Sequence, residues 1–260
     1  MKVVILCGGY GTRIRDVADD IPKPMIPIGD RPIVWHIMKY YSTFGHNDFV
    51  LCLGYKSEVI KNYFVNYEAR ANDIQITLGK DSGVGYATAH DEAGWKITMA
   101  ETGLNALTGA RINRIKKYIG DDKYFMLTYG DGVGDVDIDA LLAFHKSHGK
   151  IATLTGVRPP GRFGELEIGP NKEVLGFNEK PQASAGRING GFFILNTEVF
   201  DYLSDDERLM FEQEPIKKLV ADGQLMVFEH DGFWQPMDTS RDYALLNGLY
   251  NDKKAPWIKW

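Results

Sequence analysis

Short apolar runs alternate with segments of helical spacing from the first residues of the chain. Residues 3–7 form a continuous apolar run that ends in glycines, and Asp48–Leu53 and Tyr124–Tyr129 have the same character. Such runs are typical of strands that are buried on both faces of a sheet. The same pattern indicates further strands at residues 95–102, 151–157, 192–195 and 225–229.

Helical spacing appears between these runs. The first helix is expected to begin near Asp30, with Pro32 in its first turn, and Gly45 stands where a glycine commonly ends a helix. Ser57 is placed to cap a second helix, and Thr239 with Asp242 resembles a capping box. Other helices are expected at residues 110–119, around 141–144, at Glu214–Ala221 and at 239–250. This alternation predicts an α/β fold with a Rossmann-like, mixed but mainly parallel sheet flanked by helices.

Three segments depart from this alternation. Residues 74–78 alternate like a half-exposed strand, whereas residues 80–94 are glycine-rich and lack a period, which predicts a loop or insertion. Glu165–Ile168 and residues 173–177 are short and β-like, as in a hairpin. We find no repeat and no linker, so we expect a single domain over residues 1–260.

Composition excludes several classes of protein. The net charge is −5, which argues against a nucleic-acid binder that depends on a basic surface. The two cysteines, Cys7 and Cys52, lie in apolar runs and are expected to be core thiols. No apolar stretch approaches a membrane span, and the apolar run at the N-terminus is too short for a signal peptide. We therefore expect a cytoplasmic protein that needs no membrane.

A glycine-rich loop gives the strongest functional signal. The first strand is followed by LCGGYGTR at residues 6–13 and by PKPM at residues 22–25. Because Gly8, Gly9 and Gly11 carry no side chain, the backbone can approach a polyphosphate and point N–H groups at it. Arg13 and Lys23 add positive charge, which a triphosphate and a departing pyrophosphate require. The alternative is a tight turn beside ordinary surface cations.

Two other nucleotide-binding motifs do not fit this loop. A dinucleotide-binding oxidoreductase would show G-x-G-x-x-G and an acidic residue at the end of the second strand. Here the order is G-G-x-G, and the second strand ends in Leu53-Gly54-Tyr55. A Walker A loop fails because no G-K-[ST] follows.

Charged residues outside the loop suggest a metal and a second anion. Asp131 directly follows a buried strand and Asp238 precedes a helix, and two carboxylates together with phosphate oxygens suit Mg²⁺. Lys180 is a candidate clamp for a second phosphate. Arg111 opens a helix and is placed either to reach nucleotide phosphates or to remain a solvated cation. His36 lies on the first helix, where we interpret it as structural.

These motifs together resemble the sugar-phosphate nucleotidylyltransferases, and nearly the whole chain resembles their glucose-1-phosphate cytidylyltransferase branch. The resemblance extends over these segments: IVWHIM at 33–38, YGDGV at 129–133, PPGRFG at 159–164, EKP at 179–181, NGGFF at 189–193 and GFWQPMDT at 232–239. Residues 15–21 and 79–94 differ from the usual pattern of this branch.

The resemblance implies transfer of a cytidylyl group from CTP to glucose 1-phosphate, with release of pyrophosphate. The product, CDP-glucose, would serve deoxysugar or polysaccharide synthesis of the O-antigen type. It also implies that Asp131 and Asp238 hold Mg²⁺, that Glu179 and Asn189 bind sugar hydroxyls, and that the protein forms a homo-oligomer, a hexamer in the resembled family.

The expected single domain then divides into a nucleotide-binding part at about residues 1–157 and a small β-rich sugar-binding part at about 158–260. Arg13, Lys23, Asp131, Lys180 and Asp238 are the candidate catalytic residues. The expected nucleotide-binding residues are Leu6, Gly8, Gly9, Gly11, Thr12, Arg13, Lys23, Thr108, Arg111 and Gly130. The expected sugar-phosphate-binding residues are Glu179, Lys180, Asn189, Gly190 and Trp234, although Trp234 is equally placed to be a core aromatic.

Two alternatives remain open at this point. The chain is either the cytidylyltransferase or a sister nucleotidylyltransferase that uses UTP, dTTP or another sugar 1-phosphate. A non-catalytic nucleotide-sensing subunit on the same fold is the third possibility, but such a subunit usually lacks the charged residues that are present here.

Overall fold

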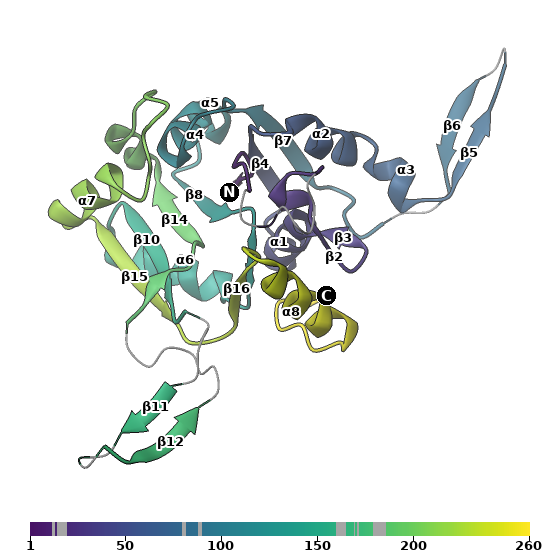
Figure 1. Ribbon diagram of the computed structural model, residues 1–260. Coiled ribbons are helices and arrows are strands. Elements are labelled where there is room, and N and C mark those ends of the chain that lie inside the picture. The colour runs from purple at the N-terminus through teal and green to yellow at the C-terminus, as the bar shows by residue number, and fades with distance from the viewer. Residues whose placement is uncertain are drawn as a thin grey trace.

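The computed structural model describes residues 1–260 except 12–13, 15–19, 80–81, 88–89, 160–164, 169, 171 and 179–185, and it describes only the backbone of 165–168 and 176–178. A twisted central sheet lies between helices, and two hairpins extend from this body (Figure 1). The described helices are α1 (Ile33–Thr43), α2 (Ser57–Val65), α3 (Tyr67–Ala71), α4 (Thr108–Arg114), α5 (Lys116–Ile119), α6 (Ile138–His148), α7 (Glu214–Ala221) and α8 (Ser240–Asn251), with 3-10 helices η2 (Lys23–Met25) and η3 (Thr197–Tyr202).

The described strands are β1 (Val3–Leu6), β2 (Pro27–Ile28), β3 (Arg31–Pro32), β4 (Asp48–Leu53), β5 (Ile74–Thr77), β6 (Gly83–Tyr86), β7 (Lys96–Glu101), β8 (Tyr124–Tyr129), β9 (Gly132–Gly134), β10 (Ala152–Val157), β11 (Glu165–Ile168), β12 (Val174–Asn178), β13 (Ile188–Asn189), β14 (Phe193–Asn196), β15 (Leu225–His230) and β16 (Trp234–Pro236).

In the described part of the chain, eight strands form the central sheet. β1 lies between β4 and β8 and runs parallel to both, and β7 extends the parallel set beyond β4. On the other side, β14 joins β8 to β10 with antiparallel pairing, and β15 runs parallel to β10. The predicted mixed, mainly parallel sheet flanked by helices is therefore confirmed.

The buried strands owe their apolar runs to helices on both faces of the sheet. Side chains alternate along a strand. Val3 and Ile5 accordingly pack in one core cluster with residues of α1, α6 and α8, and Val4 packs in another with residues of α4, α5 and α7. The predicted core thiols Cys7 and Cys52 are free and buried, and burial raises the pKa of both.

Several helix boundaries differ from prediction. Asp30 does not begin α1; Pro32 is its N-cap and Ile33 its first residue, because Arg31 and Pro32 pair with β2 as β3. The prediction that Ser57 caps α2 is wrong, since Lys56 holds that position with a left-handed backbone (φ 49°). The single helix expected at residues 110–119 is instead two, α4 (Thr108–Arg114) and α5 (Lys116–Ile119), which meet at Ile115.

Other local predictions are confirmed. Gly45 adopts positive φ (80°) directly after the C-cap of α1. Thr239 and Asp242 form the predicted capping box: the Thr239 hydroxyl accepts from Asp242 N, and the Asp242 carboxylate accepts from Thr239 N. β11 and β12 pair as the predicted hairpin. His36 is buried and its Nε2 lies 2.9 Å from the Ile28 carbonyl oxygen, a structural position in which burial lowers its pKa to about 4.

A hairpin arm, formed by β5 and β6, extends from the end of α3 (Figure 1). The prediction of a loop over residues 80–94 is wrong at Gly83–Tyr86, which forms β6 and pairs with β5. The predicted half-exposed strand is instead exposed on both faces. Its register places Ile74 opposite Tyr86 and Ile76 opposite Val84, so one face of the arm is apolar.

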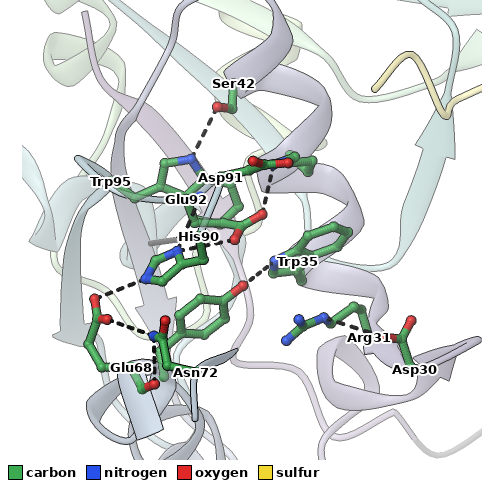
Figure 2. Close-up of polar contacts among 12 residues, drawn as sticks. Asp30, Arg31, Trp35, Ser42, Glu68, Asn72, His90, Asp91, Glu92 and Trp95 are labelled. Atoms are coloured by element: carbon green, nitrogen blue, oxygen red, sulfur yellow. Dashed lines mark hydrogen bonds and ion pairs between the residues drawn. The ribbon is translucent and has the colours of Figure 1, made fainter. Parts of the chain in front are cut away.

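A polar cluster of Trp35, Lys39, Tyr67 and Glu92 holds the segments before and after the arm, its two legs, against α1 (Figure 2). Trp35 Nε1 donates to Tyr67 on the outgoing leg (2.8 Å). On the returning leg, Lys39 Nζ lies 2.7 Å from Glu92 Oε1, and each of these side chains is only 7% exposed. Burial opposes ionisation of Glu92, but the Lys39 ammonium holds its pKa below the ordinary value. These contacts hold the segments on both sides of the arm against α1.

Candidate active site

The sheet topology places the candidate site before any side chain is considered. From β1 the chain proceeds to β4 and β7 on one side and then returns to β8 on the other side of β1. In open α/β sheets, ligands bind at the carboxyl ends of strands where the order reverses in this way. The loop after β1 and the turn after β8 meet at this point.

A pocket of about 330 Å³ lies there. Ten of the predicted nucleotide- or metal-binding positions line it, including both aspartates. The lining residues are Leu6, Cys7, Gly8, Gly9, Gly11, Lys23, Pro24, Ala106, Leu107, Thr108, Arg111, Tyr129, Gly130, Asp131 and Asp238. Thr12, Arg13, Glu179 and Lys180 were also predicted, and they lie outside the described residues.

The glycine loop forms one wall of the pocket, and the physical reason for a glycine differs from one position to the next. A Cβ at Gly8 would lie 2.1 Å from Arg111 Nη1, whereas a Cβ at Gly9 would meet nothing within 4 Å. Gly11 has positive φ (60°), which strains residues with side chains. Gly8 thus makes room for a side chain of the protein, and Gly9 leaves open space in front of the loop.

Arg111 is buried beneath the glycine loop. Its Nη1 donates to the Leu53 carbonyl and the Thr102 hydroxyl (both 2.8 Å), and its Nη2 donates to the Gly8 carbonyl (3.0 Å). The alternative of a solvated helix cation is therefore wrong, because Arg111 is 4% exposed. Among the described residues no carboxylate pairs with it, and burial lowers its pKa. An uncompensated guanidinium beside an open pocket favours an anionic ligand.

Asp131 and Asp238 converge although they are far apart in sequence. Asp131 stands between β8 and β9, and Asp238 follows β16. β9 and β16 pair antiparallel, and Met237 N donates to the Asp131 carbonyl (2.8 Å), so the two carboxylates face each other across this short ladder. Thr239, the N-cap of α8, follows Asp238 directly.

Lys23 lies between the two carboxylates. Its Nζ is 2.5 Å from Asp131 Oδ2 and 2.5 Å from Asp238 Oδ1. Burial alone would lower the pKa of Lys23, but the Asp131 and Asp238 carboxylates outweigh burial and raise it. One cation thus contacts both carboxylates at once.

Asp131 and Asp238 have the chemistry that a Mg²⁺ site requires. The ion prefers oxygen ligands and usually takes only one or two carboxylates from the protein, with water and phosphate oxygens filling its other positions. The two aspartates supply such oxygens around a single cation position. Among the described residues no group of three or more acidic, histidine or cysteine side chains is placed to hold a metal. The pair therefore fits a Mg²⁺ site completed by substrate.

Three of the predicted sugar-side residues lie in the described part of the chain, and one of them, Asn189, contacts Tyr129. Asn189 Nδ2 donates to the Tyr129 hydroxyl (2.9 Å), and Trp234 Nε1 donates to the Gly190 carbonyl (2.7 Å). Trp234 is half-buried, and β9 pairs with its strand. The structure thus places Asn189, Gly190 and Trp234 next to one another.

Tyr129 and Glu212 were not among the predicted site residues. Tyr129 lines the pocket, and its hydroxyl donates to Glu212 Oε1 (2.6 Å); Thr108 donates to Glu212 Oε2 (2.6 Å). Tyr129 directly precedes the Gly-Asp-Gly motif, which was an available signal. Glu212 stands in FEQE at 211–214, a segment without a motif, so only the fold reveals it.

Comparison with known proteins agrees with this geometry. The family model of the nucleotidyl transferases matches residues 2–252. The glucose-1-phosphate cytidylyltransferase of Salmonella typhimurium is 48% identical over 260 residues, and the probable glucose-1-phosphate cytidylyltransferase of Bacillus subtilis is 46% identical over 260 residues; each match covers both chains completely.

A solved structure shows the same fold. It is a putative glucose-1-phosphate thymidylyltransferase from Bacillus anthracis in complex with sucrose, with a TM-score of 0.70 and 18% identity, and the match covers 97% of this chain and 96% of that one. In the described part of the chain, no helix is long and apolar enough to span a bilayer. With a family model matched over nearly its whole length and close relatives of equal extent, the chain belongs to the nucleotidyl transferase family.

Proposed function

We propose that this protein transfers a cytidylyl group from CTP to α-D-glucose 1-phosphate, giving CDP-glucose and pyrophosphate. One observation carries the proposal: two carboxylates converge on one cation beside a glycine-lined pocket, in a chain that matches cytidylyltransferases over its full length. The protein is proposed to be cytoplasmic and homo-oligomeric, and its product to supply deoxysugar or polysaccharide synthesis.

The nucleotide is proposed to bind against the glycine loop. Leu6, Gly8, Gly9, Gly11 and Gly130 line the pocket, and the four glycines can offer only backbone atoms there. Arg111 holds the Gly8 carbonyl from below and adds positive charge without a carboxylate partner among the described residues. Thr108 lines the pocket. Thr12 and Arg13, which follow Gly11 in the sequence, are proposed to bind the nucleotide as well, with Arg13 stabilising the charge that develops on pyrophosphate.

The reaction is an in-line displacement. A phosphate oxygen of glucose 1-phosphate attacks the α-phosphorus of CTP, a new phosphorus–oxygen bond forms, and the bond to the β-phosphate oxygen breaks as pyrophosphate leaves. The protein supplies alignment and charge rather than a nucleophile. Asp131 and Asp238 would hold Mg²⁺, which neutralises phosphate charge when bound. Lys23 stands beside both carboxylates and is proposed to turn toward the nucleotide phosphates.

The sugar phosphate is proposed to bind on the side of Asn189, Gly190 and Trp234. Lys180 would offset the charge of the second phosphate, and Glu179 and Asn189 would bind sugar hydroxyls. Such cations on both sides of the reacting atoms reduce the repulsion between two anionic substrates.

The test is pyrophosphate release with Mg²⁺, with CTP, UTP, dTTP and GTP each crossed against several sugar 1-phosphates. We expect the highest kcat/KM for CTP with α-D-glucose 1-phosphate, and CDP-glucose as the product by mass spectrometry. A preference for UTP or dTTP would identify a sister enzyme instead. Nucleotide binding without pyrophosphate release for any pair would identify a nucleotide-sensing subunit.

A further inference from the structure

Glu212 forms hydrogen bonds with two pocket residues, Thr108 and Tyr129, that no sequence motif connects. Its Oε2 accepts from the Thr108 hydroxyl (2.6 Å), and its Oε1 accepts from the Tyr129 hydroxyl (2.6 Å). Thr108 begins α4 at one rim, and Tyr129 ends β8 beside Asp131. The Thr108 hydroxyl also accepts from Phe211 N (2.9 Å), so the segment that carries Glu212 is fixed to the same rim.

The carboxylate determines the direction of the hydrogen bonds that follow. A carboxylate only accepts, so the Tyr129 hydroxyl must donate to it and is left with lone pairs to accept with. The hydroxyl therefore accepts from Asn189 Nδ2 (2.9 Å).

This direction in turn sets the orientation of the Asn189 amide. Its nitrogen faces Tyr129, and its Oδ1 accepts from Gly191 N (2.9 Å). An amide nitrogen carries two N–H groups. One is used by Tyr129, and within the described residues the other has no acceptor, while the Asn189 side chain is exposed. Asn189 consequently offers a donor, and a reversed amide would offer an acceptor.

We propose that Glu212 is a positioning residue for the sugar substrate, which acts through Tyr129 to present an N–H group of Asn189 to a sugar hydroxyl. The proposal rests on the proposed function, because it takes the sugar to lie against Asn189. It adds that selection among sugar 1-phosphates depends on a carboxylate that does not touch the sugar.

The central variants are Glu212→Gln and Tyr129→Phe. Glutamine has nearly the same shape, but its amide nitrogen must donate to one of the two hydroxyls, which breaks the fixed direction of the chain. Phenylalanine removes the hydroxyl between Glu212 and Asn189. We expect each variant to raise the KM for glucose 1-phosphate by about tenfold, the upper end for one lost hydrogen bond between neutral groups, and to change the KM for CTP by less than about threefold.

Two measurements distinguish positioning from general support of the fold. In a double mutant, the effect on the KM for glucose 1-phosphate should be no larger than that of either single mutant, because both act on Asn189 by the same route. With a series of deoxy and deoxyfluoro glucose 1-phosphates, the wild type should discriminate most strongly against the analogue that lacks the hydroxyl bound by Asn189. Both variants should lose that discrimination and keep the others.

Glu207→Gln is the matched control, because Glu207 lies in the same segment but its carboxylate lies 3.4 Å from Arg114 Nη2 and not against Thr108 or Tyr129. It should leave both KM values unchanged. Thermal unfolding of each variant establishes that it is folded at the assay temperature.

Three results would overturn the inference. These are a Glu212→Gln enzyme with wild-type KM values, single effects that add in the double mutant, and a uniform loss of rate with every analogue and with CTP. Failure of the proposed function would look different: the wild type itself would form no CDP-glucose in the same assay, and the inference would fall with it.

Discussion

Replacing Lys23 by methionine should leave Asp131 and Asp238 facing each other without a counter-ion. Their contacting oxygens each lie 2.5 Å from Lys23 Nζ, so they are no more than 5.0 Å apart. At that separation two negative charges repel by about 3 kcal/mol at an effective dielectric constant of 20, and by about 1 kcal/mol in water. We therefore expect Lys23→Met to lower the free energy of unfolding by about 1–3 kcal/mol at pH 7 without divalent ions.

The sign of the pH dependence follows from this repulsion. In the variant, each carboxylate raises the pKa of the other above its value in the unfolded chain, so the folded state binds protons more tightly. The variant should regain stability as the pH falls toward 4, because protonation of one aspartate removes the repulsion. Lys23 itself has a raised pKa in the wild type, so its contribution is complete at pH 7 and is lost only as the pH rises above the ordinary range of lysine.

The assay is urea unfolding at pH 4, 5.5 and 7, with and without Mg²⁺. Mg²⁺ should stabilise the variant more than the wild type, because in the wild type the ion must displace an ammonium from the same oxygens. Lys217→Met, at an exposed lysine of α7, is the control for removal of a surface charge. Equal stability of Lys23→Met and the wild type at pH 7, with no greater response to Mg²⁺ than the Lys217 control, would refute the reasoning.

Three further predictions test other parts of the structure. Gly8→Ala should displace Arg111, lower the melting temperature and weaken CTP binding measured by calorimetry, whereas Gly9→Ala, whose Cβ meets nothing within 4 Å, should keep wild-type stability; equal melting temperatures would contradict this. Asp131→Asn and Asp238→Asn should each lower kcat by about 10² or more in steady-state assays with Mg²⁺, and near wild-type turnover would remove the metal assignment. Lys39→Met should cost about 3 kcal/mol in chemical unfolding at pH 7 because it leaves the buried Glu92 carboxylate without its ammonium partner, and Lys39→Met/Glu92→Met should recover most of that loss. Since the pKa of Glu92 is lowered on folding, its stabilisation is present above the ordinary range of glutamate and lost as the pH falls below it, so this difference should shrink near pH 3.

The sequence predicted those elements whose surroundings impose a regular pattern of apolar residues along the chain. β1, β4 and β8 are covered on both faces, which forces continuous apolar runs that can be recognised in the chain. The capping box at Thr239 was predictable because its partners are three residues apart. β6 was missed because the arm has no buried face to select side chains, and Gly83 and Gly85 carry no strand preference.

The active site was predictable where motifs report the chemistry and unpredictable where partners come from distant segments. Lys23, Asp131, Asp238 and the glycines were selected because their residue types suit phosphate and metal, and the structure places them around one pocket. The internal role of Arg111 was not predictable, because its acceptors are backbone carbonyls that any sequence supplies. Glu212 meets Thr108 and Tyr129 across 104 and 83 residues, so no local pattern connects them.

The hairpin arm has a practical consequence for protein engineering. All eight residues of β5 and β6 are exposed, and the polar cluster that fixes the legs lies outside both strands. A two-stranded hairpin without a packed face has little stability of its own, so its order depends on that cluster rather than on the residues of the strands. We therefore expect the strands beyond the cluster to tolerate exchange for another hairpin or a peptide tag with the core left intact, at a place far along the chain from the glycine loop and both aspartates.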